Sequence, residues 1–331
     1  MMLHAIDLHK RVLQVAAMHA HDEEGRVKET RMPACKRALG AYLRQWPGIR
    51  HRVVVEATGA WYWVADVLAE HKAELQLAHP AKVRAITEAK VKTDGRDART
   101  LLTMLRLNMV PKAHVISREL RGLRDLLRMR LQLVEKRTSS MNGIARLLEK
   151  YNCATVPALP ELAQEQAGFH EVQIKLLSAQ IKALEKRVRH ELKPNETVRR
   201  LRRIPGIGPL NAWAIYLEID GIDRFPTERQ FFSYCRVVPG ADNSGGRSRS
   251  KRSRAGNQYL KLAFSHAAVR AKHRYAEIGA AFNKKLRKKN DALARAWVRK
   301  ELARIVYHVL KDDVEYDNTF RGVALSKPKR V

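Results

Sequence analysis

One short run, RVVVEATG at residues 52–59, constrains the fold more than any other stretch of this chain. Three consecutive β-branched residues predict a buried strand, and Gly59 ends the run. Helix-forming residues follow in WYWVADVLAEHKA, and ELQLAH at residues 74–79 predicts another strand. Strands that alternate with helices in this way are typical of an α/β sheet.

The residues before this run predict an antiparallel meander. Apolar stretches at 3–8, 12–20 and 26–32 are separated by the turn-like residues HK and DEEG. A helix from about Lys36 to Gln45 is expected to follow them. We therefore predict that residues 1–115 form an α/β domain in which three strands pair before the first helix.

The pattern then becomes helical. From Arg118 to Glu149, apolar residues recur at steps of three and four among many charged residues, which predicts a long amphipathic helix. After a break at NCATVPALPE, the pattern returns and continues to Pro194. We predict an antiparallel coiled-coil hairpin over 116–195, either intramolecular only or acting as a dimerisation arm. Residues 196–331 are predicted to be mostly helical apart from the loop VVPGADNSGGRSRSKRSRAGN.

The charge of the chain indicates an anionic partner. Lys and Arg total 64 against 34 Asp and Glu, which gives a formal net charge of +30. Nucleic acid is the first expectation, because Lys and Arg bind phosphates regardless of base sequence. A membrane is not expected, since the apolar runs are short and interrupted by charge, and the start MMLHAIDLHKR predicts a cytoplasmic protein. The widely separated cysteines, Cys35, Cys153 and Cys235, predict neither disulfides nor a zinc site.

Four carboxylates stand at positions where acids need an explanation. Asp7 and Glu56 end predicted strands, while Asp94 and Asp97 lie three positions apart, on one face of a predicted helix. Separately, the first two could be turn residues, and the second two could cap a helix and suit its dipole. Together, they would repel one another unless a cation joined them. Oxygen ligands suit Mg²⁺ or Mn²⁺, and two such ions can hold the attacking and leaving oxygens of a phosphodiester.

Two features of the C-terminal region point to phosphate binding. IPGIG at residues 204–208 is similar to a helix-hairpin-helix turn, in which Gly206 and Gly208 would let backbone N–H groups approach a phosphate, although a plain turn between helices also contains Gly. Between Asp242 and Glu277 the chain has nine Lys or Arg and no acid. A charge run can be a solvated face, but this one predicts phosphate contacts by Arg247, Arg249, Lys251, Arg252, Arg254 and Lys261.

The motifs AIDLHK, VVVEATG and KTDGRDA, in this order, resemble the DEDD motif of the Piv/MooV-type insertion-sequence transposases, also known as bridge-RNA-guided recombinases. The resemblance implies a RuvC-like, ribonuclease H-like fold for the N-terminal domain. Ala5 replaces a glycine that is common in the family and leaves the acid of this motif intact. By resemblance, the catalytic metal ligands are Asp7, Glu56, Asp94 and Asp97.

The run from IPGIG through NSGG to RAGNQYLK is similar to the C-terminal transposase domain of the same family, which carries a catalytic serine. By position this serine is Ser244. Many relatives have Ser-Ser-Gly where this chain has Asn243 before the serine, so Ser248 and Ser250 are rival nucleophiles. The resemblance implies a covalent phosphoserine intermediate in DNA cleavage and rejoining.

The family resemblance also implies partners. They are donor and target DNA, a noncoding bridge RNA, and further copies of the chain in a dimer or tetramer with a composite active site. Two alternatives remain: a RuvC-like metal-dependent Holliday-junction nuclease without a serine nucleophile, and a basic nucleic-acid scaffold in which the acids only cap and pair.

Overall fold

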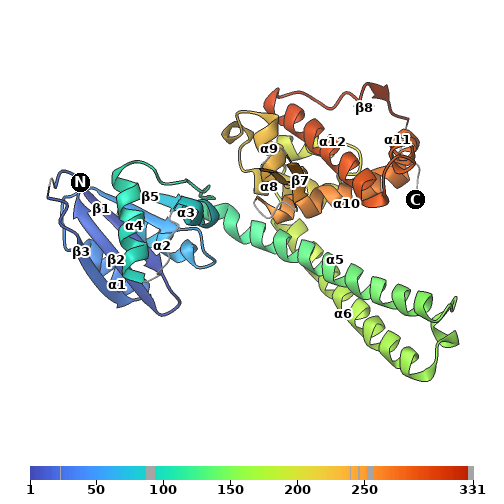
Figure 1. Cartoon of the computed structure of the whole chain (residues 1–331), viewed down its shortest axis with the longest axis horizontal. Helices are drawn as coiled ribbons and strands as arrows, with labels where there is room; N and C mark the ends of the chain where they lie inside the picture. The colour runs from blue at the N-terminus through green and yellow to red at the C-terminus, as the bar shows by residue number, and fades with distance from the viewer. Residues whose placement is uncertain (23, 87–93, 239, 245–246, 252–255, 327–331) are drawn as a thin grey trace. The chain divides into compact units, whose positions relative to one another are not determined.

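The computed structural model describes residues 1–331 apart from 23, 87–93, 239, 245–246, 252–255 and 327–331 (Figure 1). For residues 94–96, 240–244 and 247–251, the backbone alone is described. The chain divides into two compact units, Met1–Arg118 and Glu119–Val331.

The first unit is built on a five-stranded sheet with the order β3-β2-β1-β4-β5. The first three strands pair antiparallel, which confirms the meander, and β4 runs parallel to both β1 and β5. The strands are β1 (Met2–Leu8), β2 (Val12–His19), β3 (Lys28–Pro33), β4 (His51–Glu56) and β5 (Glu74–Ala78).

Helices cover both faces of this sheet. Alternate residues of β1 serve opposite faces, so Ala5 packs against α4 (Asp94–Arg106), whereas Ile6 packs against α1 (Lys36–Leu43) and α2 (Trp61–Glu70). A further helix, α3 (Pro80–Ile86), follows β5. The observed mixed sheet with helices on both sides confirms an α/β domain.

A buried polar group lies on the α1 side of the sheet. His4 is fully buried, and its ring nitrogens hydrogen-bond to the Tyr42 hydroxyl at 3.1 Å and to His51 Nδ1 at 2.9 Å. Trp46 packs edge-on against the His4 ring. Burial, with a smaller contribution from the nearby His51, lowers the pKa of His4 from its ordinary 6.5 to about 3. The fold therefore holds this histidine neutral.

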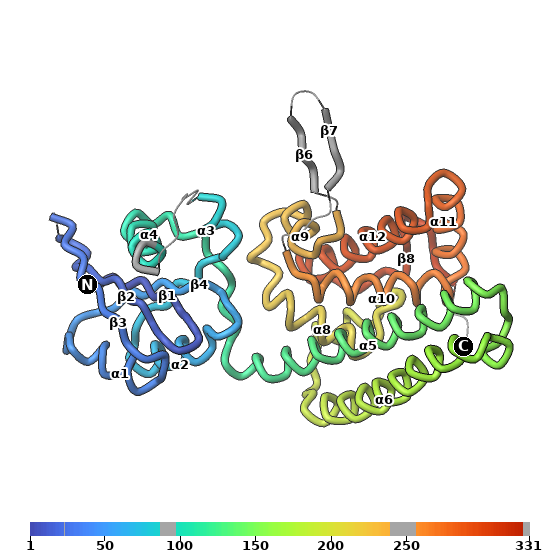
Figure 2. Tube along the Cα trace, turned by 60° about the horizontal axis from the view of Figure 1, so that its bottom comes forward, coloured from blue at the N-terminus to red at the C-terminus, as the bar shows by residue number. Residues whose placement is uncertain are grey.

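The second unit begins with two long antiparallel helices, which run side by side in both views (Figures 1 and 2). They are α5 (Arg118–Lys150) and α6 (Glu161–Glu191), separated by the short helix η1 (Val156–Ala158) at the predicted break. Arg130 of α5 pairs with Glu185 of α6 at 2.9 Å. Met141 belongs to the apolar repeat that predicted α5, but its side chain is 53% exposed. The helical hairpin is confirmed, and its coiled-coil packing remains a prediction.

The rest of the second unit is mostly helical. The base of the α5–α6 hairpin packs against α8 through an apolar cluster that includes Leu127, Val188 and Leu217. A larger core surrounds α10 and α12. The elements are α7 (Glu196–Leu201), α8 (Pro209–Ile219), η2 (Ile222–Arg224), α9 (Glu228–Tyr234), α10 (Gln258–Arg274), α11 (Ala276–Leu286), α12 (Asp291–Lys311), β8 (Thr319–Phe320) and β9 (Val323–Ala324).

One predicted loop contains regular structure. Within the stretch VVPGADNSGGRSRSKRSRAGN, the strands β6 (Gly240–Ser244) and β7 (Arg247–Lys251) pair antiparallel. The sequence signal for this was the Gly-Gly pair between them, because two-residue hairpin connections favour glycine. The loop predicted for this stretch therefore contains two paired strands, whose many charged residues gave no clear strand pattern in the sequence.

Within the part of the chain that the structure describes, no helix combines the length and the apolar character needed to cross a bilayer.

Acid is expected to destabilise the first unit through His4. Unfolding would take up a proton between about pH 6.5 and about pH 3, so the free energy of unfolding falls as the pH decreases through this window. The urea midpoint should therefore shift less between about pH 7 and about pH 4.5 in His4→Gln than in the wild type. The exposed control His21→Gln should keep the wild-type shift, and an unchanged shift in His4→Gln would contradict the burial argument.

Candidate functional site

Two of the predicted acids lie side by side at the end of parallel strands. Ile6 of β1 pairs with Val55 of β4, so the next residues, Asp7 and Glu56, are neighbours across these strands. Partners in register share one face of a sheet, and here it is the face that packs against α4, as Ala5 does. The carboxyl ends of β1 and β4 therefore present two carboxylates on the α4 side.

Asp97 joins this group from the first turn of α4. Together with Glu56 it lines a cavity of about 50 Å³, whose other polar lining residues are Arg84 and Thr100. Asp94 is the first residue of α4, and its side chain lies outside the described residues. Three predicted acids thus come from β1, β4 and α4 to one side of one sheet, although the sequence separates them widely.

A histidine that the sequence reasoning missed touches this edge. His9 Nε2 lies 2.9 Å from Asp7 Oδ2, and the His9 backbone N–H donates to the Val12 carbonyl at 3.0 Å to close the β1–β2 turn. The turn directs His9 back toward the carboxylate two residues before it. Arg84 and Thr100 were missed too, because only the packing of α3 and α4 brings them to Glu56.

The acids suit a hard divalent cation. Among the residues whose side chains the structure describes, no group of three or more His, Cys, Asp or Glu is arranged to hold a metal ion. Mg²⁺, however, is usually held by one or two carboxylates together with substrate phosphates rather than by a complete protein cage. Glu56 and Asp97 on one cavity, with Asp7 on the next strand, fit that mode of binding.

The glycine turn between α7 and α8 has a packing role. Gly206 is buried with a φ of +78°, and a Cβ added there would lie 2.1 Å from the Ala267 carbonyl oxygen of α10. Only glycine fits at this crossing. Gly206 therefore has a role in helix packing, and Gly208 is partly exposed as the N-cap of α8, while phosphate contacts by the two glycines remain a prediction.

The candidate serine ends a strand of the β6–β7 pair. Ser244 pairs in register with Arg247. The rival nucleophiles Ser248 and Ser250 are on β7, where they pair with Asn243 and Ala241 of β6. The side chains of these two strands are outside the described residues. Of the predicted phosphate-binding residues, Arg249 and Lys251 are on β7, Arg252 and Arg254 lie outside the described residues, and Lys261 is partly buried on α10.

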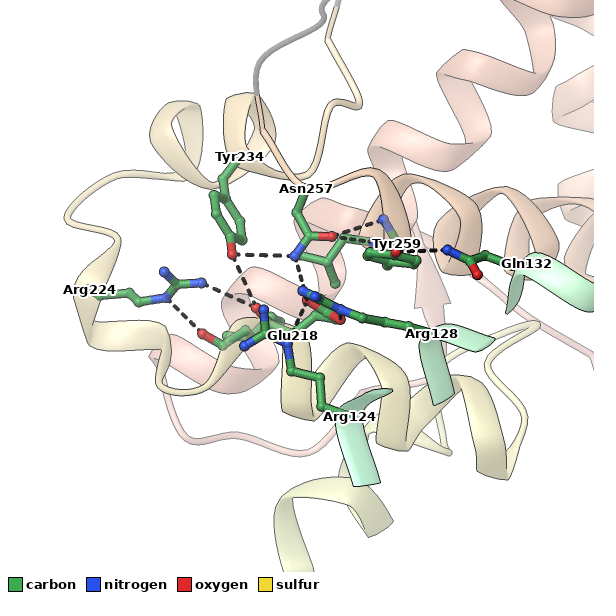
Figure 3. A network of polar contacts seen from close by, with 10 residues as sticks. Arg124, Arg128, Gln132, Glu218, Arg224, Tyr234, Asn257 and Tyr259 are labelled. Atoms are coloured by element: carbon green, nitrogen blue, oxygen red, sulfur yellow. Dashed lines mark hydrogen bonds and ion pairs between the residues drawn. The ribbon is translucent and has the colours of Figure 1, made fainter. Parts of the chain in front are cut away.

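The base of the serine-bearing segment is closed by Asn257 (Figure 3). Its backbone N–H donates to the Tyr234 carbonyl at 2.6 Å, which joins the two ends of the segment 235–256. Its side-chain oxygen caps α10 by accepting from the N–H groups of Tyr259 and Leu260. Its amide nitrogen donates to Glu218 Oε2 at 2.6 Å.

Glu218 connects this base to the long helix α5 (Figure 3). The residue is only 4% exposed, and Arg128 Nη2 donates to its Oε2 at 2.9 Å while Arg124 Nε lies 3.4 Å from the same oxygen. Burial would raise the pKa of the Glu218 carboxyl, but the hydrogen bond and charge of Arg128 and the charge of Arg124 outweigh it and hold the pKa below its ordinary value. The buried carboxylate is therefore ionised and shared between α5 and the Asn257 cap.

Comparisons with known proteins match both units. The DEDD transposase model of the IS110 type matches residues 5–153, and the model of the transposase IS116/IS110/IS902 family matches residues 198–284. A probable family 20 transposase of Pseudomonas aeruginosa is 26% identical over 288 residues, which cover 80% of this chain and 82% of that protein. The transposase for insertion sequence element IS1111A of Coxiella burnetii is 26% identical over 283 residues, covering 80% and 76% of the two chains.

These matches show that the chain is similar to insertion-sequence transposases over both units. The DEDD transposase model spans all four acids, from Asp7 to Asp97, and the mixed α/β sheet with a mostly helical remainder fits a RuvC-like DEDD transposase. The second transposase model spans Gly206, Ser244 and Asn257, so the glycine turn and the anchored serine segment both fall inside the matched region.

Removing the buried charge at Glu218 should destabilise the second unit of this protein. Glu218→Gln would leave Arg124 and Arg128 without their carboxylate, and breaking a buried pair in this way costs about 3–5 kcal/mol. Denaturant unfolding followed by far-ultraviolet circular dichroism would measure the loss. The matched control Glu196→Gln removes the partner of Arg199 on the surface and should have little effect. Equal stability of the two variants would contradict the assigned role of Glu218.

Proposed function

We propose that this chain is the transposase of an insertion sequence and that it cuts and rejoins DNA strands. The observation that carries the proposal is the gathering of Asp7, Glu56 and Asp97 on one side of the sheet, within a region that matches DEDD transposases. Carboxylates so placed are suited to phosphodiester chemistry, for which the highly basic chain supplies the affinity.

Asp7, Glu56, Asp94 and Asp97 would hold Mg²⁺ or Mn²⁺ in this proposal. A bound ion would offset the negative charge that develops on the phosphoryl and leaving oxygens. The chain's own contribution is to keep the carboxylates in place: the β1–β4 pairing fixes Asp7 beside Glu56, and α4 fixes Asp97 at the Glu56 cavity.

Ser244 is the proposed nucleophile. Its Oγ would form a bond to the phosphorus of the DNA strand while the bond from phosphorus to the leaving deoxyribose oxygen breaks. The serine releases its hydroxyl proton, and the leaving oxygen takes one up. Because one phosphoester replaces another, a second DNA hydroxyl can reverse the step and rejoin strands. The place of Ser244 in the NSGG run that resembles the family's serine motif supports it over Ser248 and Ser250.

The nucleic-acid partners would be donor DNA, target DNA and a noncoding bridge RNA. A chain with a net charge of +30 and many Lys and Arg can hold duplexes by their backbones and leave the choice of sequence to base pairing. The proposed phosphate contacts of the second unit are Gly206, Gly208, Arg247, Arg249, Lys251, Arg252, Arg254 and Lys261.

The hairpin of α5 and α6 is the proposed dimerisation arm. Four apolar side chains of α6 are more than half exposed, and their spacing of seven, three and four residues places them on one stripe of the helix. These residues are Leu162, Phe169, Val172 and Leu176. A composite active site, with the acids of one copy and the serine of another, requires such an assembly.

A metal-dependent Holliday-junction nuclease of the RuvC type is the alternative. It is favoured by the same acidic cavity, because Glu56 and Asp97 need no serine to cut a phosphodiester by attack of water. The two functions share their metal ligands and differ only in the nucleophile.

The covalent intermediate distinguishes them. Wild-type protein incubated with DNA of the element's end and Mg²⁺ should yield a protein–DNA adduct on a denaturing gel, and Ser244→Ala should yield none. The matched variants Ser248→Ala and Ser250→Ala should keep the adduct, and Asp7→Asn should lose it. Cleavage without adduct in both wild type and Ser244→Ala would establish the nuclease, and full activity of Asp7→Asn would exclude both functions.

Charge placed on the exposed stripe of α6 should weaken assembly. Phe169→Lys combined with Val172→Lys introduces like charges where two copies would meet, so sedimentation velocity should show a shift toward the monomer. The control Glu171→Lys adds the same charge on another side of α6 without removing an apolar side chain. Unchanged assembly of the stripe variant would refute the role of the arm.

A further inference from the structure

A row of side chains crosses the first unit from acid to base. Asp7 pairs in register with Gln14 of β2, and Gln14 pairs with Arg31 of β3. Glu56 precedes them on β4, so four adjacent strands contribute Glu56, Asp7, Gln14 and Arg31 in order. Register partners share a face, so this row lies on the α4 side of the sheet.

The basic end of the row opens into a cavity of about 370 Å³. The β1–β2 turn forms one wall, and β2 and β3 form the others. Three lining residues carry a full positive charge, and none is a carboxylate. The lining residues are His9, Lys10, Arg11, Val12, Gln14 and Arg31.

Some basic residues of this unit are paired with carboxylates, whereas the three cations at this cavity are not paired with any described carboxylate. Arg52 pairs with Glu74 at 2.9 Å, and Arg26 pairs with Asp22 at 3.4 Å. Within the described part of the chain, no carboxylate forms an ion pair with Lys10, Arg11 or Arg31. Three like charges around one cavity repel one another. A bound anion would replace this repulsion with attraction to each of the three cations.

The cavity is joined to the acidic edge by a direct contact. His9 lines the cavity and lies 2.9 Å from Asp7 through its Nε2. Adjacent strands lie about 4.8 Å apart, so the backbone of Arg31, two strands from Asp7, is about 10 Å away from it. An anion in the cavity would therefore belong to the same ligand as a group held at Asp7 and Glu56.

We propose that the cavity bounded by Lys10, Arg11 and Arg31 binds a backbone phosphate of the DNA strand whose neighbouring phosphodiester is held at the acidic edge. This inference rests on the proposed function, because it takes DNA as the ligand of Asp7 and Glu56. The three cations would hold the DNA strand by its phosphate and would not distinguish between nucleobases. This contact would determine which phosphodiester bond of the strand reaches the carboxylates.

The salt dependence of DNA binding tests the contact. We would compare the wild type with Lys10→Gln/Arg11→Gln/Arg31→Gln on a duplex of the element's end, without divalent ions so that no strand is cut. Each lost phosphate contact lowers the slope of log affinity against log salt by about 0.9, so loss of the one proposed contact should make the slope of the triple variant shallower by about 1. The control Lys36→Gln/Arg37→Gln removes exposed charges of α1, on the other face of the sheet, and should keep the wild-type slope.

Neutral methylphosphonates placed one at a time along the strand would locate the contact. One substitution near the cleaved bond should weaken binding by the wild type and have no further effect on the triple variant, since the two changes remove the same interaction. A control substitution elsewhere should weaken both proteins equally. Purely additive losses at every position would overturn the inference, as would a slope equal to that of the control variant.

Two further measurements separate the possible failures. Binding of the noncoding RNA flanking the element should be unchanged in the triple variant, and a loss confined to that RNA would overturn the assignment to DNA. Asp7→Asn should bind the duplex with the wild-type slope and form no adduct. If Asp7→Asn is inactive while the triple variant binds as the wild type does, only this inference fails. If Asp7→Asn remains active, the proposed function fails first.

Discussion

The parallel pairing of β1 with β4 is the constraint on which the candidate site depends. It sets Asp7 and Glu56 next to each other at the same end of the sheet, and it turns both toward α4, whose first turn supplies Asp97. A shift of this register by one residue would move Glu56 to the opposite face. The apolar alternation that selects the register, with Ala5 and Ile6 on opposite sides, therefore also assembles the acids.

Much of this arrangement could be predicted from the sequence because the signals were local. The meander, the strand ending in Glu56, the helix after KTDGRDA and the break between α5 and α6 all carried strong periodicity or turn residues. What could not be predicted depended on tertiary contacts. Arg84 and Thr100 reach the Glu56 cavity only through the packing of their helices. The buried Gly206 is required by the close approach of α10, a helix far along the chain.

Charged side chains have different surroundings in the two units. In the second unit, the nearly inaccessible Glu218 carboxylate is bound by two arginines and an amide of the same unit. These ion pairs and this hydrogen bond hold α5 and the base of the 235–256 segment together. In the first unit, carboxylates gather at one end of a row across the sheet, and cations that form no ion pair with a described residue lie at the other. Cations in this state favour an anionic ligand such as a nucleic acid.

The hydrogen bond between Asn257 and Tyr234 has a consequence for how such proteins diversify. It closes the segment 235–256 at its base, where the described residues Asn257, Arg124 and Arg128 hold the cap of α10 and the buried Glu218 carboxylate. Related chains can therefore differ in the length and composition of residues 235–256 and still keep the Asn257 hydrogen bonds to Tyr234 and Glu218.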